Sequence, residues 1–226
     1  MDNPLIRKFE SFARLSSDDK AALDMLVRTG VQQVGAREDV IGEGDLPTHV
    51  LVVVDGWACR YKVLEDGRRQ IIAFFLPGDV CDHSLFVLRE MDHSIGALTP
   101  LTYARLPRHV MERLIETRPR IMYGLWWDTL VTAAIQREWT VSLGQRSAIE
   151  RVSHLICELF VRTRVVGLVE DNSFEWPVTQ ADLAEARAVI QPLQVFAGLV
   201  GHFHGAAADE IHFAGGVVGF DDGLAG

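Results

Sequence analysis

Four glycines recur at an almost constant interval in the first half of the chain. Gly44, Gly56, Gly67 and Gly78 stand eleven or twelve residues apart, with runs of apolar and β-branched residues between them. Turn signals at this spacing are typical of short antiparallel strands that close into a small barrel or jelly roll. The spacing therefore predicts an N-terminal antiparallel β-roll.

The strands of this β-roll are expected where β-branched and aromatic residues gather. They are Val31–Val34, His49–Val54, Trp57–Leu64, Arg69–Phe75 and Leu101–Leu106. Asp55-Gly56 and Asp66-Gly67 each stand between two of these runs, and Asp-Gly is a strong signal for a tight hairpin. We therefore predict hairpin turns at both places. Ahead of the strands, Ser16 precedes an apolar run from Ala21 to Val27 and predicts a serine-capped helix.

A polar stretch interrupts the strand pattern directly after Gly78. Asp-His-Ser occurs twice in it, at Asp82-His83-Ser84 and at Asp92-His93-Ser94. A barrel that carries polar side chains usually binds a ligand, so we expect an effector pocket here, formed by Cys81, Asp82, His83, His93 and Ser94. A hydrolytic Ser-His-Asp triad within either tripeptide is excluded, because adjacent residues of a strand point to opposite faces.

Composition narrows the class of protein. The chain has 226 residues, 48% of them hydrophobic, which suffices for one large or two small domains. It has no run of eighteen apolar residues and no apolar N-terminal signal, so we expect a cytoplasmic protein without a membrane partner. Its three cysteines, Cys59, Cys81 and Cys157, fit reduced thiols better than a disulfide framework. The net charge of −9 disfavours non-specific attraction to phosphate, although one basic face could still bind DNA.

Two prolines open helices after the last strand. Pro107 precedes one helical pattern, and Pro119 precedes another that continues to Leu143 and is expected to stop at Gly144. This second helix is apolar on more than one face, which predicts contact with its own barrel and with a second copy of the chain. The expected dimer interface is Ile121, Met122, Leu125, Trp126, Leu130 and Ile135. The alternative is that the segment is the central helix of a monomer.

A small helical module follows. Ser147-Ala148-Ile149-Glu150 is a capping box for a helix that reaches Gly167. A short strand is expected at Phe174-Glu175-Trp176, and Thr179-Gln180-Ala181-Asp182 is an N-cap signature for another helix. The order is thus a β-roll, a long helix and a helical module, an α+β fold.

In this order the chain resembles the Crp/Fnr superfamily of bacterial transcription regulators. The resemblance covers residues 5 to 186 and is carried by Gly44, Asp55-Gly56, Gly67, Leu76-Pro77-Gly78-Asp79, Ser94, the segment Arg146 to Val152 and the segment Trp176 to Ala184. It implies an effector-sensing, cyclic-nucleotide-binding-like β-roll over 1–117, a dimerisation helix over 118–144 and a winged helix-turn-helix module over 145–226. The implied DNA-binding residues are Thr179, Gln180, Asp182 and Ala184.

The resemblance departs from the family pattern in the pocket. The family's cyclic-nucleotide binders place a glutamate and an arginine where this chain has His83 and His93, while the serine is kept as Ser94. A histidine cannot reproduce the charged planar fork of arginine, so we do not expect cAMP as the effector. Cys81-Asp82-His83 has the Cys-x-His spacing of the family's haem-containing carbon-monoxide sensor, so haem remains an alternative to another small effector or to a filled pocket.

A second departure begins at Arg187. The family's recognition helix is expected here, but Pro192 falls inside it. From residue 187 onward the sequence contains one arginine and four acidic residues. We therefore expect the module to be incomplete and divergent from about residue 187. His202, His204, Asp209, Glu210 and His212 match no metal-binding spacing, so we expect no metal site in this tail.

Two functions remain open. The first is a dimeric, effector-sensing Crp/Fnr-type transcription regulator. The second is a sensory or interaction dimer of the same fold that has lost specific DNA binding. An enzyme is not expected, because no nucleophile, phosphate loop or paired carboxylates stand out.

Overall fold

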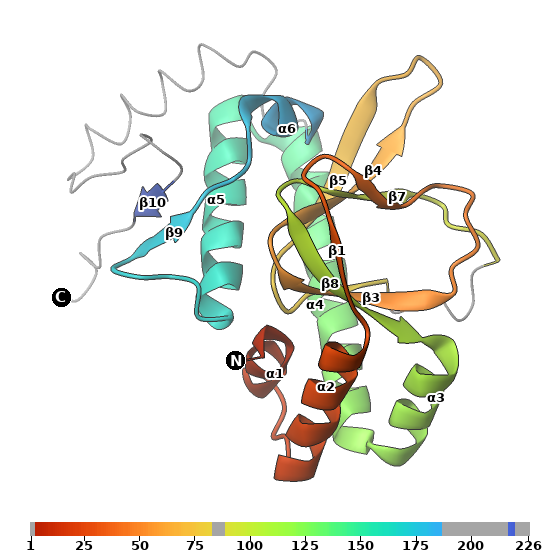
Figure 1. The fold of residues 1–226 in the computed structure, drawn as a ribbon. Coiled ribbons are helices and arrows are strands. Elements are labelled where there is room, and N and C mark those ends of the chain that lie inside the picture. The colour runs from red at the N-terminus through yellow and green to blue at the C-terminus, as the bar shows by residue number, and fades with distance from the viewer. Residues whose placement is uncertain (1–2, 83–88, 187–216, 220–226) are drawn as a thin grey trace. The chain divides into compact units, whose positions relative to one another are not determined.

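The computed structural model describes residues 3–82, 89–186 and 217–219, the last three by their backbone. They fall into two compact units, Met1–Arg137 and Glu138–Gly226. The elements in chain order are α1 (Pro4–Glu10), α2 (Ser17–Thr29), β1 (Val31–Val34), β2 (Asp39–Ile41), β3 (His49–Asp55), β4 (Ala58–Val63), β5 (Arg69–Phe75), β6 (Val80–Cys81), β7 (Ser94–Ala97), β8 (Leu101–Pro107), α3 (Arg108–Thr117), α4 (Pro119–Gln145), α5 (Ala148–Val165), β9 (Ser173–Glu175), α6 (Gln180–Glu185) and β10 (Val217–Gly219) (Figure 1).

The first unit is built on two four-stranded antiparallel sheets. Their strand orders are β1-β8-β3-β6 and β2-β7-β4-β5. The predicted β-roll is therefore confirmed, and the five predicted strands agree with the structure to within one residue at each end. The sequence missed β2, β6 and β7, which have only two to four residues each, too few to show an alternating pattern.

The hairpin predicted at Asp66-Gly67 is confirmed. It joins β4 to β5, which pair with each other, and Arg68 donates to the Asp66 carboxylate within the turn. All four regularly spaced glycines have positive φ, between +83° and +89°. The regular spacing thus marks four places where the chain reverses in the left-handed region of the backbone map.

The hairpin predicted at Asp55-Gly56 is wrong. β3 pairs with β6 and β8, whereas β4 pairs with β5 and β7, so this turn carries the chain from one sheet to the other. A Cβ at Gly56 would lie 2.2 Å from the carbonyl oxygen of Pro100. Glycine is required because the corner packs against another backbone segment, and the same dipeptide serves a crossover as readily as a hairpin.

Helices contact the β-roll at one end. α2 and α3 both contact β8, and α1 contacts α2 and β3 (Figure 1). The predicted serine cap of α2 is confirmed, because Ser16 and Asp19 bond reciprocally as a capping box. The core lies between these helices and the sheets and includes Phe9, Val50 and Ile121, each with no exposed surface.

The long helix α4 runs from Pro119 to Gln145. The predicted stop at Gly144 is wrong by one residue, since Gly144 lies inside the last turn. A Cβ at Gly124 would come within 2.8 Å of the Phe9 ring, so α1 and α4 pack closely. Nothing lies within 4 Å of the corresponding position of Gly144, so no close contact requires a glycine there.

The second unit contains the predicted capping box at the start of α5 and the predicted N-cap at the start of α6, which is a capping box as well. Ser147 and Glu150 cap α5, and Thr179 and Asp182 cap α6. The break between α4 and α5 consists of two residues, Arg146 and Ser147. The predicted short strand appears one residue earlier, as β9, and pairs with β10.

Candidate functional site

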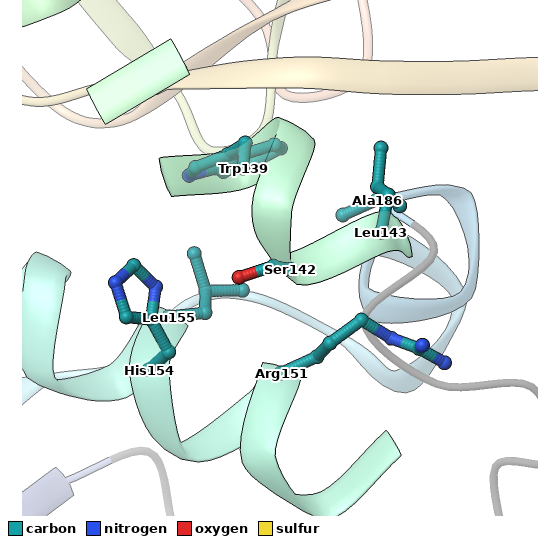
Figure 2. A pocket seen from close by; sticks show the side chains of 7 residues that line it. All are labelled: Trp139, Ser142, Leu143, Arg151, His154, Leu155 and Ala186. Carbon is teal, nitrogen blue, oxygen red and sulfur yellow. The ribbon is translucent and has the colours of Figure 1, made fainter. Parts of the chain in front are cut away.

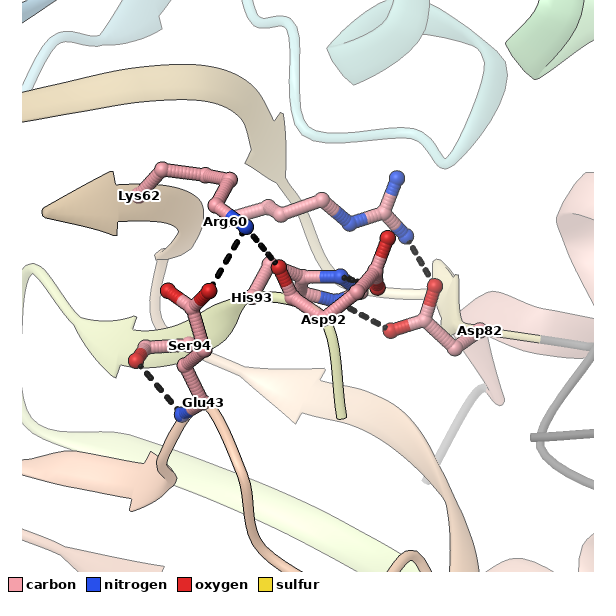
Figure 3. Close-up of polar contacts among 7 residues, drawn as sticks. All are labelled: Glu43, Arg60, Lys62, Asp82, Asp92, His93 and Ser94. Atoms are coloured by element: carbon pink, nitrogen blue, oxygen red, sulfur yellow. Dashed lines mark hydrogen bonds and ion pairs between the residues drawn. The ribbon is translucent and has the colours of Figure 1, made fainter. Parts of the chain in front are cut away.

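A cluster of charged side chains lies on the sheet β2-β7-β4-β5. Alternation along β4 puts Arg60 and Lys62 on the same face of the strand. Asp82 follows β6 directly, and Asp92 and His93 immediately precede β7. We call Glu43, Arg60, Lys62, Asp82, Asp92 and His93 the polar cluster (Figure 3).

Asp82 is at the centre of the polar cluster. One of its carboxylate oxygens accepts from the Arg60 guanidinium, and the other lies 2.7 Å from His93 Nε2. The guanidinium carbon of Arg60 also lies 5.1 Å from the centre of the Phe75 ring, a cation–π distance. The side chains of Arg60, His93 and Asp82 are 15%, 7% and 12% exposed, so this charge pairing is largely shielded from water.

His93 bridges two carboxylates. Its Nε2 faces Asp82, and its Nδ1 lies 2.7 Å from Asp92 Oδ1. A neutral imidazole has one donor and one acceptor nitrogen, so only the doubly protonated ring can donate to both carboxylates. The ring is therefore held between two carboxylates, one at each nitrogen. Asp92 is mostly exposed, so the His93–Asp92 contact faces solvent.

Lys62 closes the solvent side of the polar cluster. Its Nζ lies 2.6 Å from Glu43 Oε1 and also donates to the carbonyl of Asp92 (Figure 3). The Ser94 hydroxyl accepts from the backbone N–H of Glu43 at 2.9 Å. Ser94 therefore holds the segment after β2 against β7, instead of presenting its hydroxyl to a ligand.

The expected effector pocket is only partly assembled as predicted. Asp82 and His93 do meet, whereas Ser94 contacts Glu43 and pairs with Tyr61 across the sheet. His83 lies outside the described residues. Sequence reasoning missed Arg60 and Lys62, although two cations at alternate positions of a predicted strand were a signal that one strand face is charged.

Cys81 does not fit a metal or haem ligand. The residue is buried, and burial, followed by the nearby Asp82 and Asp79 carboxylates, raises the pKa of its thiol well above the usual value. Ligation requires the thiolate, which this environment disfavours. Among the described residues no group of three His, Cys, Asp or Glu could hold a metal ion, and the histidines of the tail lie outside them.

A second polar group occupies the opposite face of β4 and was not predicted. The Tyr61 hydroxyl donates to Asp39 at 2.7 Å, and Arg69 stacks on the Tyr61 ring at 3.7 Å while donating to Cys59 Sγ. Burial, together with Asp39, raises the pKa of Tyr61. A Cβ at Gly96 would approach Asp39, Tyr61 and Arg69, so this group is packed tightly and leaves no space for a ligand.

The predicted dimer residues of α4 separate into two groups. Ile121 and Leu125 are buried in the core of their own unit, which corrects their assignment to a dimer interface. Trp126 and Leu130 are 61% and 63% exposed, while Met122 and Ile135 are intermediate. The exposed apolar side chains Tyr123, Trp126, Trp127, Leu130 and Val131 recur at helical spacing, and we call them the α4 stripe.

The second unit has a hollow of its own beside the end of α4. It spans about 300 Å³ when the space open to solvent is included, and it is lined by Trp139, Ser142, Leu143, Arg151, His154, Leu155 and Ala186 (Figure 2). Trp139 donates to Glu158 at 2.6 Å, and Arg151 donates to the carbonyl of Arg146 at 2.8 Å. These contacts hold the end of α4 against α5.

The predicted DNA-binding residues have different environments in α6. Asp182 is buried, and its carboxylate accepts from the Thr179 backbone and hydroxyl, so it serves the helix cap and cannot contact a phosphate. Gln180 and Ala184 are exposed and remain available. Residues 187–216 lie outside the residues that the structure describes.

Comparison with known proteins agrees with this arrangement. Residues 31–118 match the family model of the cyclic nucleotide-binding domain. The transcriptional activator protein FnrL of Cereibacter sphaeroides is 29% identical over 180 residues, which cover 76% of this chain and 69% of FnrL. The nitrogen fixation regulation protein FixK of Bradyrhizobium diazoefficiens is 33% identical over 150 residues, covering 66% of this chain and 61% of FixK. These relatives are transcription regulators, not enzymes.

Solved structures share the fold. The structure of FixK2 from Bradyrhizobium japonicum superimposes with a TM-score of 0.70 at 23% identity, covering 84% of this chain and 92% of FixK2. Across the described residues, no helix is both long and apolar enough to span a membrane. The β-roll, the long helix, the capped helical module and the sequence relatives together place this chain in the Crp/Fnr superfamily of transcription regulators.

Proposed function

We propose that this protein is a homodimeric transcription regulator that senses a small effector at the polar cluster and couples it through α4 to a DNA-binding module in residues 145–226. The observation that carries this proposal is the two-sided character of α4. One side packs Ile121 and Leu125 into the β-roll core, while the other exposes the α4 stripe. A helix that belongs to the sensory unit and continues to the helical module can transmit a change at the sensory unit.

The α4 stripe is the proposed dimer seam. Burying a large apolar side chain contributes roughly 1.5–3 kcal/mol, so five of them along one helix favour association with an equivalent helix. Tyr123 and Trp126 are arranged edge to face with ring centres 6.4 Å apart, and Trp127 stacks on Phe12 at 6.1 Å. The stripe is thus already ordered by its own aromatic contacts, which lowers the entropy lost on association.

Leu130→Glu tests the seam. We expect wild-type protein to sediment at twice the 25.2 kDa chain mass and the variant to sediment as a monomer or to aggregate, because a carboxylate would be buried without a partner. The matched control is Met25→Glu on α2, where the original side chain is 65% exposed, close to the 63% of Leu130. A monomeric wild type at micromolar concentration would contradict the proposal.

The effector is proposed to differ from cAMP. The position of the family's phosphate-binding arginine holds His93, and both nitrogens of that ring are engaged by carboxylates. A cyclic phosphate would have to approach between Asp82 and Asp92, against two negative charges. Calorimetry with cAMP should therefore show no binding at micromolar concentrations, and a micromolar or tighter dissociation constant would contradict this.

A second candidate function is a sensory or interaction dimer without specific DNA binding. The observation that favours it is the charge of residues 145–226, which hold five arginines against eleven acidic residues, a balance of −6. DNA binders neutralise phosphates with basic residues, so this balance opposes association with DNA. A mobility-shift assay with two-fold symmetric DNA sites distinguishes the two functions.

A further inference from the structure

Resting on the proposed role of the polar cluster as the effector site, we propose that Arg60 and His93 form a binding site for a small oxyanion, a carboxylate or a phosphate, and that the chain fills this site with its own Asp82. An external oxyanion then binds only where it replaces the Asp82 carboxylate. The polar cluster is in this view a site that holds an internal ligand.

Two side chains converge on the Asp82 carboxylate. Arg60 reaches Asp82 from β4, and His93 reaches it from the start of β7, so both donate to a single carboxylate. Arg60 and His93 are mostly buried, and a buried guanidinium or imidazolium requires an anionic partner. Without Asp82, these two side chains would lose the carboxylate between them, while His93 would keep its contact with Asp92 through the opposite ring nitrogen.

Asp82 does not satisfy all the donors of this site. Its two oxygens bond Arg60 and His93, and the buried Nε of Arg60 has no hydrogen-bond partner among the residues that the structure describes. The guanidinium edge that contains Nε matches the two oxygens of a carboxylate or phosphate in a fork-to-fork pair. A free oxyanion could engage both Nε and Nη2 of this edge, whereas the tethered Asp82 carboxylate bonds Nη2 and leaves Nε unused.

The backbone of Asp82 has an unfavourable conformation. Its φ is +62°, in the left-handed region that disfavours residues with a Cβ, although Asp tolerates it better than most. The contacts of the carboxylate offset this unfavourable conformation. Asp82→Gly removes the carboxylate and at the same time relieves the backbone, so it can empty the site without adding strain.

The remaining charges of the polar cluster do not compete for the same position. Lys62 bonds Glu43 and the Asp92 carbonyl, and Asp92 bonds the opposite nitrogen of His93. Loss of Asp82 therefore leaves one cationic charge uncompensated at the position of its carboxylate. The site should accept a small anion there and should not accept a cation.

The test uses the full-length chain and its Asp82→Gly variant. Thermal unfolding is followed in sodium acetate, sodium phosphate and sodium chloride at equal ionic strength and pH 7. We expect acetate or phosphate at 100 mM to raise the Tm of the variant by about 3 °C or more over chloride, since ligand binding to the folded state stabilises it. The wild type, whose site is filled, should respond equally to the three salts.

Two further variants make the outcome decisive. In Asp82→Gly, Arg60→Met the anion response should disappear, while in Asp82→Gly, Arg68→Met, which alters an exposed arginine of the β4–β5 turn, it should persist. If Asp82→Gly is unfolded in chloride, recovery of its fold by acetate or phosphate becomes the readout. Acetate alone identifies a carboxylate site and phosphate alone a phosphate site. An equal response to all three salts, or no recovery by any of them, overturns the proposal.

Failure of this test is distinguishable from failure of the proposed function. The salt response of Asp82→Gly depends only on groups inside the β-roll, whereas the Leu130→Glu test reads self-association through α4. A filled anion site in a monomer, or a dimer without an anion site, would each reject one proposal and leave the other standing.

Discussion

The three cysteines were all predicted to be reduced thiols, but their environments in the structure differ. Cys59 and Cys81 are buried, whereas Cys157 is exposed on α5. Burial and the neighbouring Asp82 and Asp79 carboxylates raise the pKa of Cys81 well above its ordinary value, and partial burial raises that of Cys157. Because the thiolate is the reactive form, exposure should decide which thiol reacts first.

We predict that a disulfide reagent at pH 7.5 modifies one thiol of the native protein quickly, and that this thiol is Cys157. The Cys157→Ser variant should then show no rapid phase until denaturant is added, when Cys59 and Cys81 become accessible. The measurement is the absorbance of the released thiol with time. A rapid phase that persists in Cys157→Ser would contradict the burial of the other two.

Asp19 makes a pH-dependent contribution to the stability of the folded protein. A hydrogen bond from the Ser16 side chain, against the opposing effect of burial, lowers the pKa of Asp19, with further help from the Ser16 backbone and Arg118. A group with a lowered pKa in the folded state stabilises it above the unfolded pKa, near 3.9, and loses this effect as the pH falls through the folded value.

Asp19→Ala should therefore reduce the free energy of unfolding by about 1 kcal/mol at pH 7, the usual size of a capping contribution. Urea unfolding at pH 7 and pH 3 should show a smaller difference from the wild type at the lower pH. Asp18→Ala is the control, because Asp18 is an exposed neighbour in the same helical turn. An equal loss in the two variants would exclude the capping box as the cause.

At the scale of elements, one lysine joins three segments of the first unit. Lys8 of α1 lies 2.6 Å from Asp79, in the turn before β6, and 2.5 Å from Asp128 of α4. Burial by itself lowers the pKa of Lys8, but the two carboxylates outweigh it, and the pKa is raised. The ion pairs therefore contribute below the unfolded lysine pKa and are lost as the pH rises through the folded value.

We predict that Lys8→Met lowers the free energy of unfolding by about 3–5 kcal/mol, because it removes a buried cation that two buried carboxylates contact. The loss should shrink at acidic pH, where these carboxylates bind protons. Lys20→Met, which breaks an exposed pair with Glu10, should change stability by less than about 1 kcal/mol. Equal effects at pH 7 and pH 4 would show that lost packing, and not charge, is responsible.

At the scale of the whole molecule, the decisive property is affinity for DNA. Residues 145–226 carry a balance of −6, and phosphate contacts supply most of the non-specific affinity of DNA-binding proteins. Of the four residues expected to contact DNA, Asp182 is committed to its helix cap. The purified protein should therefore bind two-fold symmetric sites weakly or not at all.

A mobility-shift assay with salt varied from 50 to 200 mM measures this prediction. Nanomolar binding with a steep salt dependence would contradict it and would support the regulator function over the sensory alternative. Arg151→Ala and Arg162→Ala, two arginines of α5 in the same module, would then show whether this helix supplies the phosphate contacts. Their loss should weaken all sequences alike if it does.

Local features of the sequence determined much of this fold. The serine cap at Ser16, the capping box at Ser147, the N-cap at Thr179 and the hairpin at Asp66-Gly67 were all predicted and are all present. Each depends on hydrogen bonds between residues at most four positions apart, so the information lies within one short segment. Family membership followed similarly, from the order of such segments along the chain.

Tertiary structure alone decided the rest, because it depends on which distant groups compete for the same partner. Asp55-Gly56 became a crossover since β3 and β4 found better partners in different sheets. Ile121 and Trp126 look equally apolar in sequence, yet the first is buried in the core and the second is exposed. The Arg60–Asp82–His93 contact joins residues from three segments, and no local spacing could predict it, because the burial that pairs these charges exists only once the sheet has formed.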